Sequence, residues 1–488
     1  MAASELIERV AELVERHGRA APAEVAAAMA GIGQRLREPV RIAIVGRVKA
    51  GKSTMVNALL GQRVAPTDVS ECTRVVTWFH HGSPQRLVIE LDDGSRVERQ
   101  LAAGGMLPAE LGVPLDHVAG VHAYLSNQVL RSMTLIDTPG LGSVHPAYSA
   151  STQQLLEASR RSTAAADRAD AVVFLMNQQL LEDELGTLAS LRDHLDDPLS
   201  CTRTLGVLSR ADQLGDGGQD PWQVAVELAD HYAGILRDQV ASVVPVIGLL
   251  AETAQTASLT EQDTRALAEL ARLPEAAITR LTWSADRFVA QEAPVSAEVR
   301  QRLLDRLALY GIVRALDLAR DPAVGAVAMR RQLAAMSGIE AVRRSLSALF
   351  DEQEHVLKVR SALAALTRLA YHRDLDEAGR RSLRNDVEAL RMDPLMQPIA
   401  EIEAWHAVSS GAVALPDELR EDLRILVMPG SPRSKLAAAS DDPEVLRAAA
   451  RAALVRWRTF LNSEGAPPQQ GVARVALRSY QHLMAAAG

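Results

Sequence analysis

The sequence predicts an α/β domain with a mostly parallel sheet, followed by an elongated all-helical bundle. Three observations predict this arrangement. Strand and helix patterns alternate between residues 40 and 250, the strand patterns stop after residue 251, and the remainder of the 488 residues has helical periodicity. Hydrophobic residues make up 48% and charged residues 23% of the chain, so it can bury a sizeable core.

Two helices are expected in residues 1–38, before the first strand. Ile7, Val10 and Val14 give the first helix an apolar stripe. Gly18 interrupts this pattern, and Pro22 stands where a second helix can begin.

The alternating region contains the expected sheet. Several of its strands are continuous runs of Val, Ile and Leu, as in sheets that are covered on both faces. Residues 86–102 alternate around Asp93-Gly94, which predicts an antiparallel hairpin. Strands are expected at 41–45, 74–80, 86–91, 118–125, 133–136, 171–176, 204–208 and 243–247, and helices at 53–60, 151–166, 181–195 and 222–239.

The last part of the chain is expected to be almost entirely helical, with breaks at Pro and Gly. Its longest pattern runs from Ile339 to about His372, and a single helix of that length would measure roughly 50 Å. We therefore expect three regions: N-terminal helices over 1–38, an α/β domain over 39–295 and a helical region over 296–488.

Charge, cysteine content and hydropathy argue against several classes of protein. The formal net charge of −8 argues against a nucleic-acid coat, and no RNA-binding module is recognisable. Two cysteines cannot form a disulfide framework, so a cytoplasmic location is expected. We find no signal-peptide pattern or lipidation motif, and no apolar run approaches the ~20 residues that span a bilayer.

A phosphate-binding loop is predicted between the first strand and the helix at 53–60. Residues 46–53 match the pattern GxxxxGK[ST], in which backbone N–H groups surround phosphate oxygens at a helix N-terminus. Lys52 is expected to reach the β- and γ-phosphates, and the Ser53 hydroxyl to bind Mg²⁺. The candidate nucleotide-binding residues here are Gly46, Arg47, Val48, Lys49, Ala50, Gly51, Lys52, Ser53 and Thr54.

Two downstream elements complete the predicted magnesium site. Asp137-Thr138-Pro139-Gly140 follows a strand and matches DxxG, in which Asp137 holds Mg²⁺ through its shell and the Gly140 N–H senses the γ-phosphate. Thr73 precedes the expected strand at 74–80 and is the candidate switch I threonine, whose hydroxyl completes the Mg²⁺ sphere when γ-phosphate is present. Thr67 is the competing candidate.

The base-binding element is predicted at Ser209-Arg210-Ala211-Asp212, where GTPases carry [NT]KxD. The Asp212 carboxylate would accept hydrogen bonds from guanine N1 and N2, and Arg210 would stack on the base. Since Ser209 and Arg210 replace the usual Asn or Thr and Lys, ATP stays an alternative nucleotide. Ile247-Gly248 occupies the slot of the last guanine-binding element without matching it.

Lysine usage draws attention to one more residue. Only four of the 53 basic residues are lysines, and Lys49 and Lys52 are two of them. We therefore interpret Lys49, with Lys52 and Thr73, as a candidate catalytic residue. It would supply positive charge near the β/γ bridging oxygen or stabilise a dimer across the nucleotide; the alternative is that Lys49 only braces the loop.

The order of these motifs resembles the dynamin-like GTPases, and most closely their bacterial branch. The shared features are Gly-x-x-Lys-x-Gly-Lys-Ser-Thr at 46–54, Asn-Ala-Leu-Leu-Gly at 57–61, Ala-Pro-Thr at 65–67, Cys72-Thr73, Asp-Thr-Pro-Gly at 137–140 and Val-Val-Pro-Val at 243–246. The resemblance covers most of the chain, although the helical half is similar mainly by pattern. Leu141 stands where small Ras-like enzymes place a catalytic Gln, so hydrolysis cannot use that residue.

The resemblance implies a head that binds GTP or GDP with Mg²⁺, a neck built from the N-terminal helices and helices of the far end, and a helical trunk whose tip touches lipid. It further implies nucleotide-dependent self-association and membrane remodelling on the inner face of the plasma membrane. Fission, a role in envelope stress or drug tolerance, and a paralogous dynamin-like partner are compatible with it.

The membrane-facing tip is predicted in residues 425–436, an apolar strip followed by a loop with two cations. Met428 would enter the headgroup layer, and Arg433 and Lys435 would meet anionic lipid. The alternative is a helix end followed by a Pro-rich connection. A second basic segment spans Arg368 to Arg384, for which a solvated helix face is the alternative.

Three functions are thus left open by the sequence. The first is a dynamin-like GTPase that assembles on membranes, which the large helical region favours. The second is a GTPase switch or scaffold whose helical half binds a protein, and the third is a P-loop ATPase.

Overall fold

The chain forms two compact units in the computed structural model. The sheet unit comprises Arg41–Leu191 and Thr204–Leu346, and the helical unit joins Met1–Val40 to Ser347–Gly488. Residues 296–346 therefore belong with the sheet, although the sequence placed the boundary at 295. The structure describes residues 2–66, 71–140, 169–180, 184–186, 188, 204–215, 219–237, 239–351, 354–391, 393–409, 413–428, 430–462 and 466–486.

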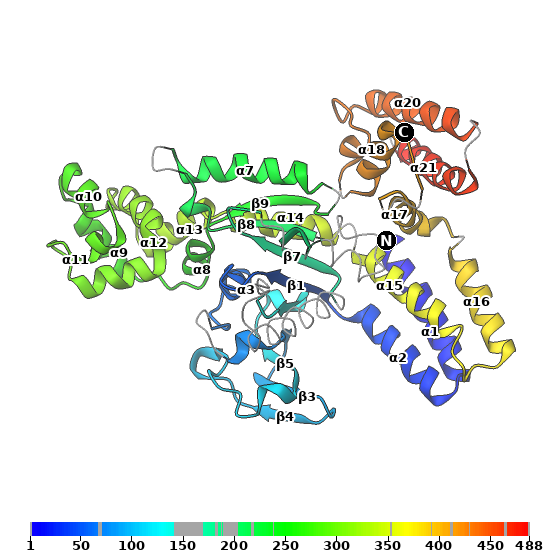
Figure 1. The fold of residues 1–488 in the computed structure, drawn as a ribbon, viewed down its shortest axis with the longest axis horizontal. Coiled ribbons are helices and arrows are strands. Elements are labelled where there is room, and N and C mark those ends of the chain that lie inside the picture. The colour runs from blue at the N-terminus through cyan, green and yellow to red at the C-terminus, as the bar shows by residue number, and fades with distance from the viewer. Residues whose placement is uncertain are drawn as a thin grey trace, which may run out of the picture. The chain divides into compact units, whose positions relative to one another are not determined.

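The described residues of the sheet unit form one nine-stranded sheet in the order β4-β3-β5-β2-β6-β1-β7-β8-β9 (Figure 1). The pairs β1–β7, β7–β8, β8–β9 and β2–β5 are parallel, whereas β2–β6, β3–β4 and β3–β5 are antiparallel. The strands are β1 Val40–Gly46, β2 Thr77–His81, β3 Arg86–Leu91, β4 Arg96–Arg99, β5 Val118–Leu125, β6 Met133–Asp137, β7 Ala171–Met176, β8 Thr204–Ser209 and β9 Ser242–Val246.

The central strands are apolar because they are covered on both faces. Every residue of β7 and β8 is buried. All eight predicted strands overlap an observed one, and the predicted hairpin is the β3–β4 pair. The strand expected at 74–80 begins only at Thr77, because residues Glu71–Arg74 form a 3₁₀ turn, η1. That turn is held at Glu71, whose carboxylate accepts a hydrogen bond from the Leu111 N–H at 2.7 Å.

Helices of the sheet unit pack around the sheet and at one of its ends (Figure 1). Those with described bounds are α3 Lys52–Leu60, α7 Pro221–Ile235, α8 Gly248–Gln255, α9 Glu261–Ala271, α10 Glu275–Leu281, α11 Ala285–Ala290, α12 Ala297–Ala319, α13 Ala326–Met336 and α14 Ile339–Asp351. Helix α7 begins where Asp220 caps it and Pro221 occupies its first turn. The helices predicted at 151–166 and over most of 181–195 lie outside the described residues.

The helical unit buries one apolar core beneath amphipathic helices. Helix α15 lies against both α1 and α2, and Val10, Met29 and Leu366 are buried between these helices. Trp405 and Trp457 are buried farther along the same core. The helices are α1 Ala2–Ala20, α2 Ala23–Arg37, α15 Glu354–Leu369, α16 Glu377–Arg391, α17 Gln397–Ser409, α18 Asp417–Val427, α19 Pro432–Lys435, α20 Pro443–Leu461 and α21 Pro467–Ala486.

The long helix predicted from Ile339 to about His372 is helical at every described residue from Ile339 to Leu369. Helix α14 ends at Asp351, α15 begins at Glu354, and residues 352–353 lie outside the described part. The apolar repeat seen in the sequence thus lies on helix throughout its described part, because α14 and α15 are both amphipathic.

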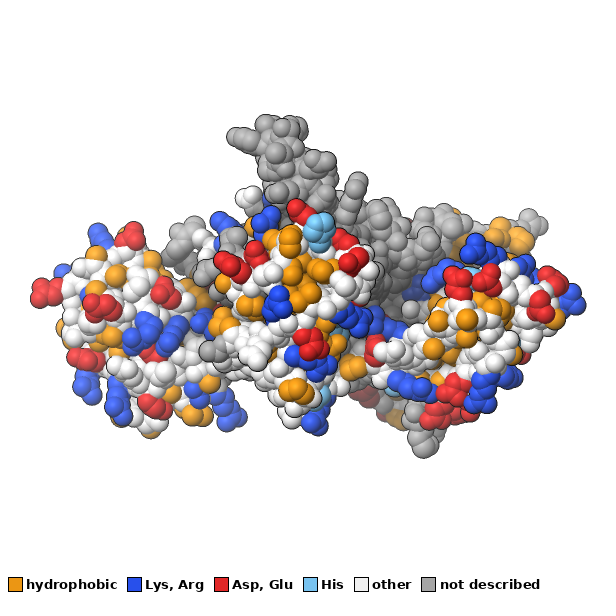
Figure 2. Space-filling model, turned by 90° about the horizontal axis from the view of Figure 1, so that it is seen from below, with side chains coloured by type: hydrophobic (Ala, Val, Ile, Leu, Met, Phe, Trp, Pro, Cys, Tyr) orange, Lys and Arg blue, Asp and Glu red, His pale blue; other side chains and the backbone are white. Residues whose placement is uncertain are grey.

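The surface carries both signs of charge. On the face shown in Figure 2, Lys and Arg side chains are interspersed with Asp and Glu over the described residues. None of the described helices combines the length and the apolar character needed to cross a bilayer.

Candidate nucleotide-binding site

The predicted phosphate loop follows β1, which lies between β6 and β7 in the middle of the sheet. Ligands of α/β sheets bind beyond the carboxyl ends of the strands, and this is where residues 46–52 lie. Helix α3 begins at Lys52, so its N-terminal N–H groups face the same region. Gly46 contacts β7 so closely that a Cβ there would come within 2.8 Å of the Leu175 carbonyl oxygen.

The loop turns through two residues with positive φ. Lys49 has φ 65° and Gly51 has φ 93°, which together reverse the chain between β1 and α3. The Ala50 N–H donates to the Arg47 carbonyl at 3.1 Å and closes the turn. At its apex Val48 is 52% exposed and Lys49 is also exposed, so the Lys49 ammonium is available to a ligand or a second molecule.

The side chain of Lys52, the first residue of α3, reaches back into the loop. Its ammonium donates to the Gly46 carbonyl at 3.1 Å and to the Arg47 carbonyl at 2.9 Å. Burial lowers the pKa of Lys52, and the negative charge of Asp137 partly opposes this effect. A buried ammonium that donates to two carbonyl oxygens of the loop is suited to bind phosphate oxygens there.

Asp137 and Ser53 meet at the end of β6. The Ser53 hydroxyl donates to Asp137 Oδ2 at 3.0 Å, while the buried Oδ1 has no hydrogen-bond partner among the described residues. Burial raises the pKa of Asp137 to about 6, although the Lys52 charge and the Ser53 hydrogen bond act in the opposite direction. A buried carboxylate oxygen without a donor, next to a hydroxyl, is the oxygen set that Mg²⁺ binds, so these residues fit that ion.

The DxxG segment is tied to the phosphate loop at two points. The Thr138 hydroxyl donates to the Ile44 carbonyl of β1 at 2.7 Å. A Cβ at Gly140 would lie 2.7 Å from Val48 Cα and 2.9 Å from the Val48 nitrogen. Only glycine therefore fits at 140, where the DxxG segment lies directly against the backbone of the predicted phosphate loop.

The predicted base-binding element follows β8, next but one to β1. The Ser209 hydroxyl donates to the Met176 carbonyl at 2.9 Å, which ties this element to β7. Burial raises the pKa of the half-buried Asp212, and its own backbone N–H and the charge of Arg210 only partly offset this. Arg210 has φ 55° and donates to the Lys49 carbonyl at 2.7 Å. Its guanidinium thus bonds to the phosphate loop, whereas the sequence assigned it to stacking on a base.

The structure brings together Lys52, Ser53, Asp137 and Gly140 and joins the base element to this cluster through Arg210 and Lys49. Thr73 lies in η1, but its side chain is outside the described part, as is Thr67. Sequence reasoning missed the anchoring role of Thr138. The sequence feature that could have indicated this role is a hydroxyl-bearing residue directly after Asp137, the last residue of β6.

Comparison with known proteins decides the family. The dynamin family profile matches residues 42–211. The isoniazid-induced protein IniC of Mycobacterium tuberculosis is 31% identical over 463 residues, which are 93% of this chain and 92% of that protein. The chain belongs to the dynamin family. It is a GTPase that binds guanine nucleotide, as the resemblance seen in the sequence implied.

Other similarities are shorter or structural. The GTPase Der of Desulforudis audaxviator is 34% identical over 134 residues, which are 25% of this chain and 30% of Der. A solved bacterial dynamin pair, described as sensing and tethering membranes, aligns over 99% of this chain and 80% of its own chain at 13% identity and a TM-score of 0.34. For this dynamin-family GTPase, the α/β head with a mostly parallel sheet and the helical region are confirmed.

Proposed function

We propose that this GTPase needs Mg²⁺ and couples GTP hydrolysis to self-assembly and membrane remodelling on the inner face of the plasma membrane. The observation that carries the Mg²⁺ requirement is the buried Asp137 Oδ1, which lacks a hydrogen-bond donor among the described residues and lies on the carboxylate that Ser53 contacts. Bound Mg²⁺ would neutralise charge that develops on the phosphates.

The residues of this chain have distinct roles in the proposed site. Ser53 and Asp137 hold the ion, and Thr73 joins them when γ-phosphate is present. Lys52 binds the β- and γ-phosphate oxygens, and the Gly140 N–H senses the γ-phosphate. Asp212, with Ser209 and Arg210, selects guanine over adenine.

The helical unit supplies the proposed neck and trunk. Helices α1, α2 and α15 pack together, although they come from opposite ends of the chain, and this grouping supports the neck. We place the trunk in the remaining helices, and the membrane-facing tip at Met428, Arg433 and Lys435. Self-association is the primary assembly in this proposal, and a paralogous dynamin-like chain would be a second partner.

A second candidate function is a GTPase switch whose helical half binds a protein. One observation favours it: the cations of the proposed tip have acidic neighbours. Arg433 lies 3.7 Å from Asp441, and the charge of Lys435 acts on the half-buried Glu401. These carboxylates reduce the positive charge that the tip offers to lipid.

GTP hydrolysis with and without anionic liposomes separates the two candidates, with Lys52→Ala as the inactive control. Turnover that rises with liposome concentration, and with protein concentration on them, supports membrane assembly. Turnover that is unaffected by lipid supports the switch. Loss of turnover in EDTA and recovery with Mg²⁺ tests the ion requirement separately.

A further inference from the structure

One buried polar pair lies outside the site as described so far. Asn57 of α3 and Glu252 of α8 are each 1% exposed, and Asn57 Nδ2 donates to Glu252 Oε1 at 2.7 Å. The two residues are far apart in the sequence; Asn57 follows the predicted phosphate loop, and Glu252 follows the slot of the last guanine-binding element. Asn57 comes five positions after Lys52, and Glu252 comes four positions after Gly248.

Asn57 also holds the chain that leaves α3. Its Oδ1 accepts the N–H groups of Val64 and Ala65, both at 2.9 Å, and its Nδ2 donates to the Ala65 carbonyl at 2.9 Å. With Glu252, these contacts use both donors and both lone-pair sites of the amide. Residues 64–65 are therefore held by one side chain, shortly before the segment that leads to Thr73.

Glu252 fixes the orientation of that amide. A carboxylate can only accept, so it sets which end of Asn57 faces it and leaves Oδ1 for Val64 and Ala65. Arg63, 44% exposed, lies 3.3 Å from Glu252 Oε1 and balances the buried charge. Helix α8 in turn packs on α3, the helix that follows the phosphate loop. A Cβ at Gly248 would lie 3.5 Å from Thr54 Cγ2, which is ordinary van der Waals contact.

We infer that Asn57 and Glu252 are positioning residues for hydrolysis: they fix the start of switch I relative to the phosphate loop and connect it to helix α8. This inference rests on the proposed role of Thr73 in switch I. A group that senses γ-phosphate acts on bound GTP and its turnover but not on bound GDP. Loss of the pair should therefore lower kcat for GTP hydrolysis while GDP affinity is kept.

The test compares five variants of the full chain by kcat, KM for GTP, GDP affinity and urea midpoint. Asn57→Ala is expected to lower kcat ~10-fold or more, with GDP affinity within ~2-fold, because two backbone N–H groups lose a buried acceptor. Glu252→Ala is expected to lower kcat less, since the bonds of Asn57 to the backbone are kept. Glu252→Gln keeps the accepting oxygen and is expected to restore most of kcat.

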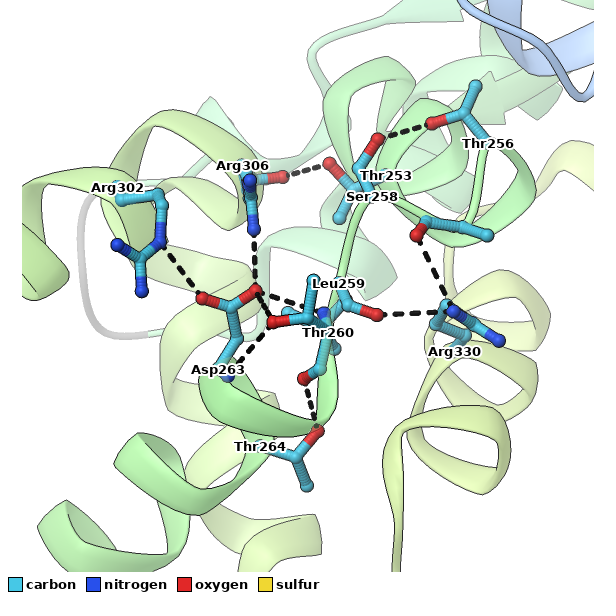
Figure 3. A network of polar contacts seen from close by, with 11 residues as sticks. Thr253, Thr256, Ser258, Leu259, Thr260, Asp263, Thr264, Arg302, Arg306 and Arg330 are labelled. Atoms are coloured by element: carbon cyan, nitrogen blue, oxygen red, sulfur yellow. Dashed lines mark hydrogen bonds and ion pairs between the residues drawn. The ribbon is translucent and has the colours of Figure 1, made fainter.

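Thr253→Val is the matched control. Thr253 is the next residue of α8, is fully buried, and donates its hydroxyl to the Arg306 carbonyl of α12 (Figure 3). It should lose stability with kcat unchanged. If Asn57→Ala and Glu252→Ala change GTP and GDP binding alike, in proportion to their loss of stability, the inference is overturned. Should Asn57→Ala not fold, Glu252→Ala decides alone, and a parental kcat overturns it.

Thr73→Ala separates this inference from the proposed site. A parental kcat in Thr73→Ala rejects the switch I assignment on which the inference rests. A lowered kcat in Thr73→Ala together with a parental kcat in both Asn57→Ala and Glu252→Ala keeps the assignment and rejects the positioning role.

Discussion

Asp137 shows how a single buried residue can favour ligand binding over stability. The residue is 8% exposed, one carboxylate oxygen has no partner among the described residues, and burial raises its pKa to about 6. The folded, ligand-free protein therefore disfavours the charged form that a cation needs. Binding of a cation to the carboxylate would remove this free-energy cost of the ligand-free state.

We predict that Asp137→Asn stabilises the nucleotide-free protein at pH 7 and removes Mg²⁺-dependent turnover. Because the pKa is higher in the folded than in the unfolded state, the parent loses stability as pH rises from about 4 to about 6. The asparagine variant lacks that loss, so it should gain up to about 3 kcal/mol above this window. Urea unfolding in EDTA from pH 4 to pH 8 measures the difference; equal stability of the two proteins throughout would contradict it.

Lys49 can be tested without disturbing the loop. Its backbone carbonyl accepts the bond from Arg210, whereas its side chain is exposed, so substitution leaves the main-chain contact in place. We predict that Lys49→Met lowers kcat by ~10-fold or more and that Lys49→Arg keeps much of it, since charge is the required property. Unchanged GTP affinity and turnover in Lys49→Met would show that the residue only braces the loop.

At the scale of elements, α9 and α12 are joined through one fully buried acid. Asp263 completes a capping box with Thr260, and its oxygens bind Arg302 at 3.0 Å and Arg306 at 2.5 Å (Figure 3). Burial would raise its pKa, but the Thr260 hydrogen bonds and the two arginines outweigh this and hold the pKa below its usual value. The first turn of α9 is thereby joined to two successive turns of α12 by ion pairs to one carboxylate.

We predict that Asp263→Ala destabilises the sheet unit by about 3 kcal/mol at pH 7, because it removes a helix cap and leaves two partly buried arginines unpaired. A depressed pKa contributes stability that is present above about pH 4 and is lost as pH falls through the folded pKa. The gap between variant and parent in urea unfolding should therefore shrink in acid. GDP affinity is the control, and it should not change.

The boundaries of the strands show which sequence patterns depend only on neighbouring residues and which depend on distant contacts. The expected ranges 118–125 and 171–176 coincide with β5 and β7. Strand β7 is a continuous apolar run that is buried throughout, and buried residues recur along β5. The strand expected at 74–80 started too early, since η1 depends on the bond from Leu111 to Glu71, forty residues away in the sequence. No pattern within residues 71–80 carries that information.

At the scale of the whole molecule, the division into two compact units leads us to expect that nucleotide binding and lipid binding can be separated. The sheet unit contains every described residue of the nucleotide site. Residues 41–346 include all nine described strands except Val40, the first residue of β1. We predict that residues 41–346 expressed alone bind GDP as tightly as the full chain and fail to sediment with anionic liposomes. Calorimetry and co-sedimentation measure the two properties, with Lys52→Ala in the same segment as the control. Liposome binding by this segment would move the lipid contact away from the helical unit.

The sequence by itself determined the phosphate loop, the DxxG segment and the positions of the strands along the chain. Each depends on neighbouring residues: glycines that allow a turn, a hydroxyl beside a lysine, an apolar run. Only the tertiary structure decided that Asn57 meets Glu252, that Arg210 bonds to Lys49, and that residues 296–346 pack with the sheet. Those contacts join segments distant in the chain, and their geometry arises when the sheet and its helices bury a common core.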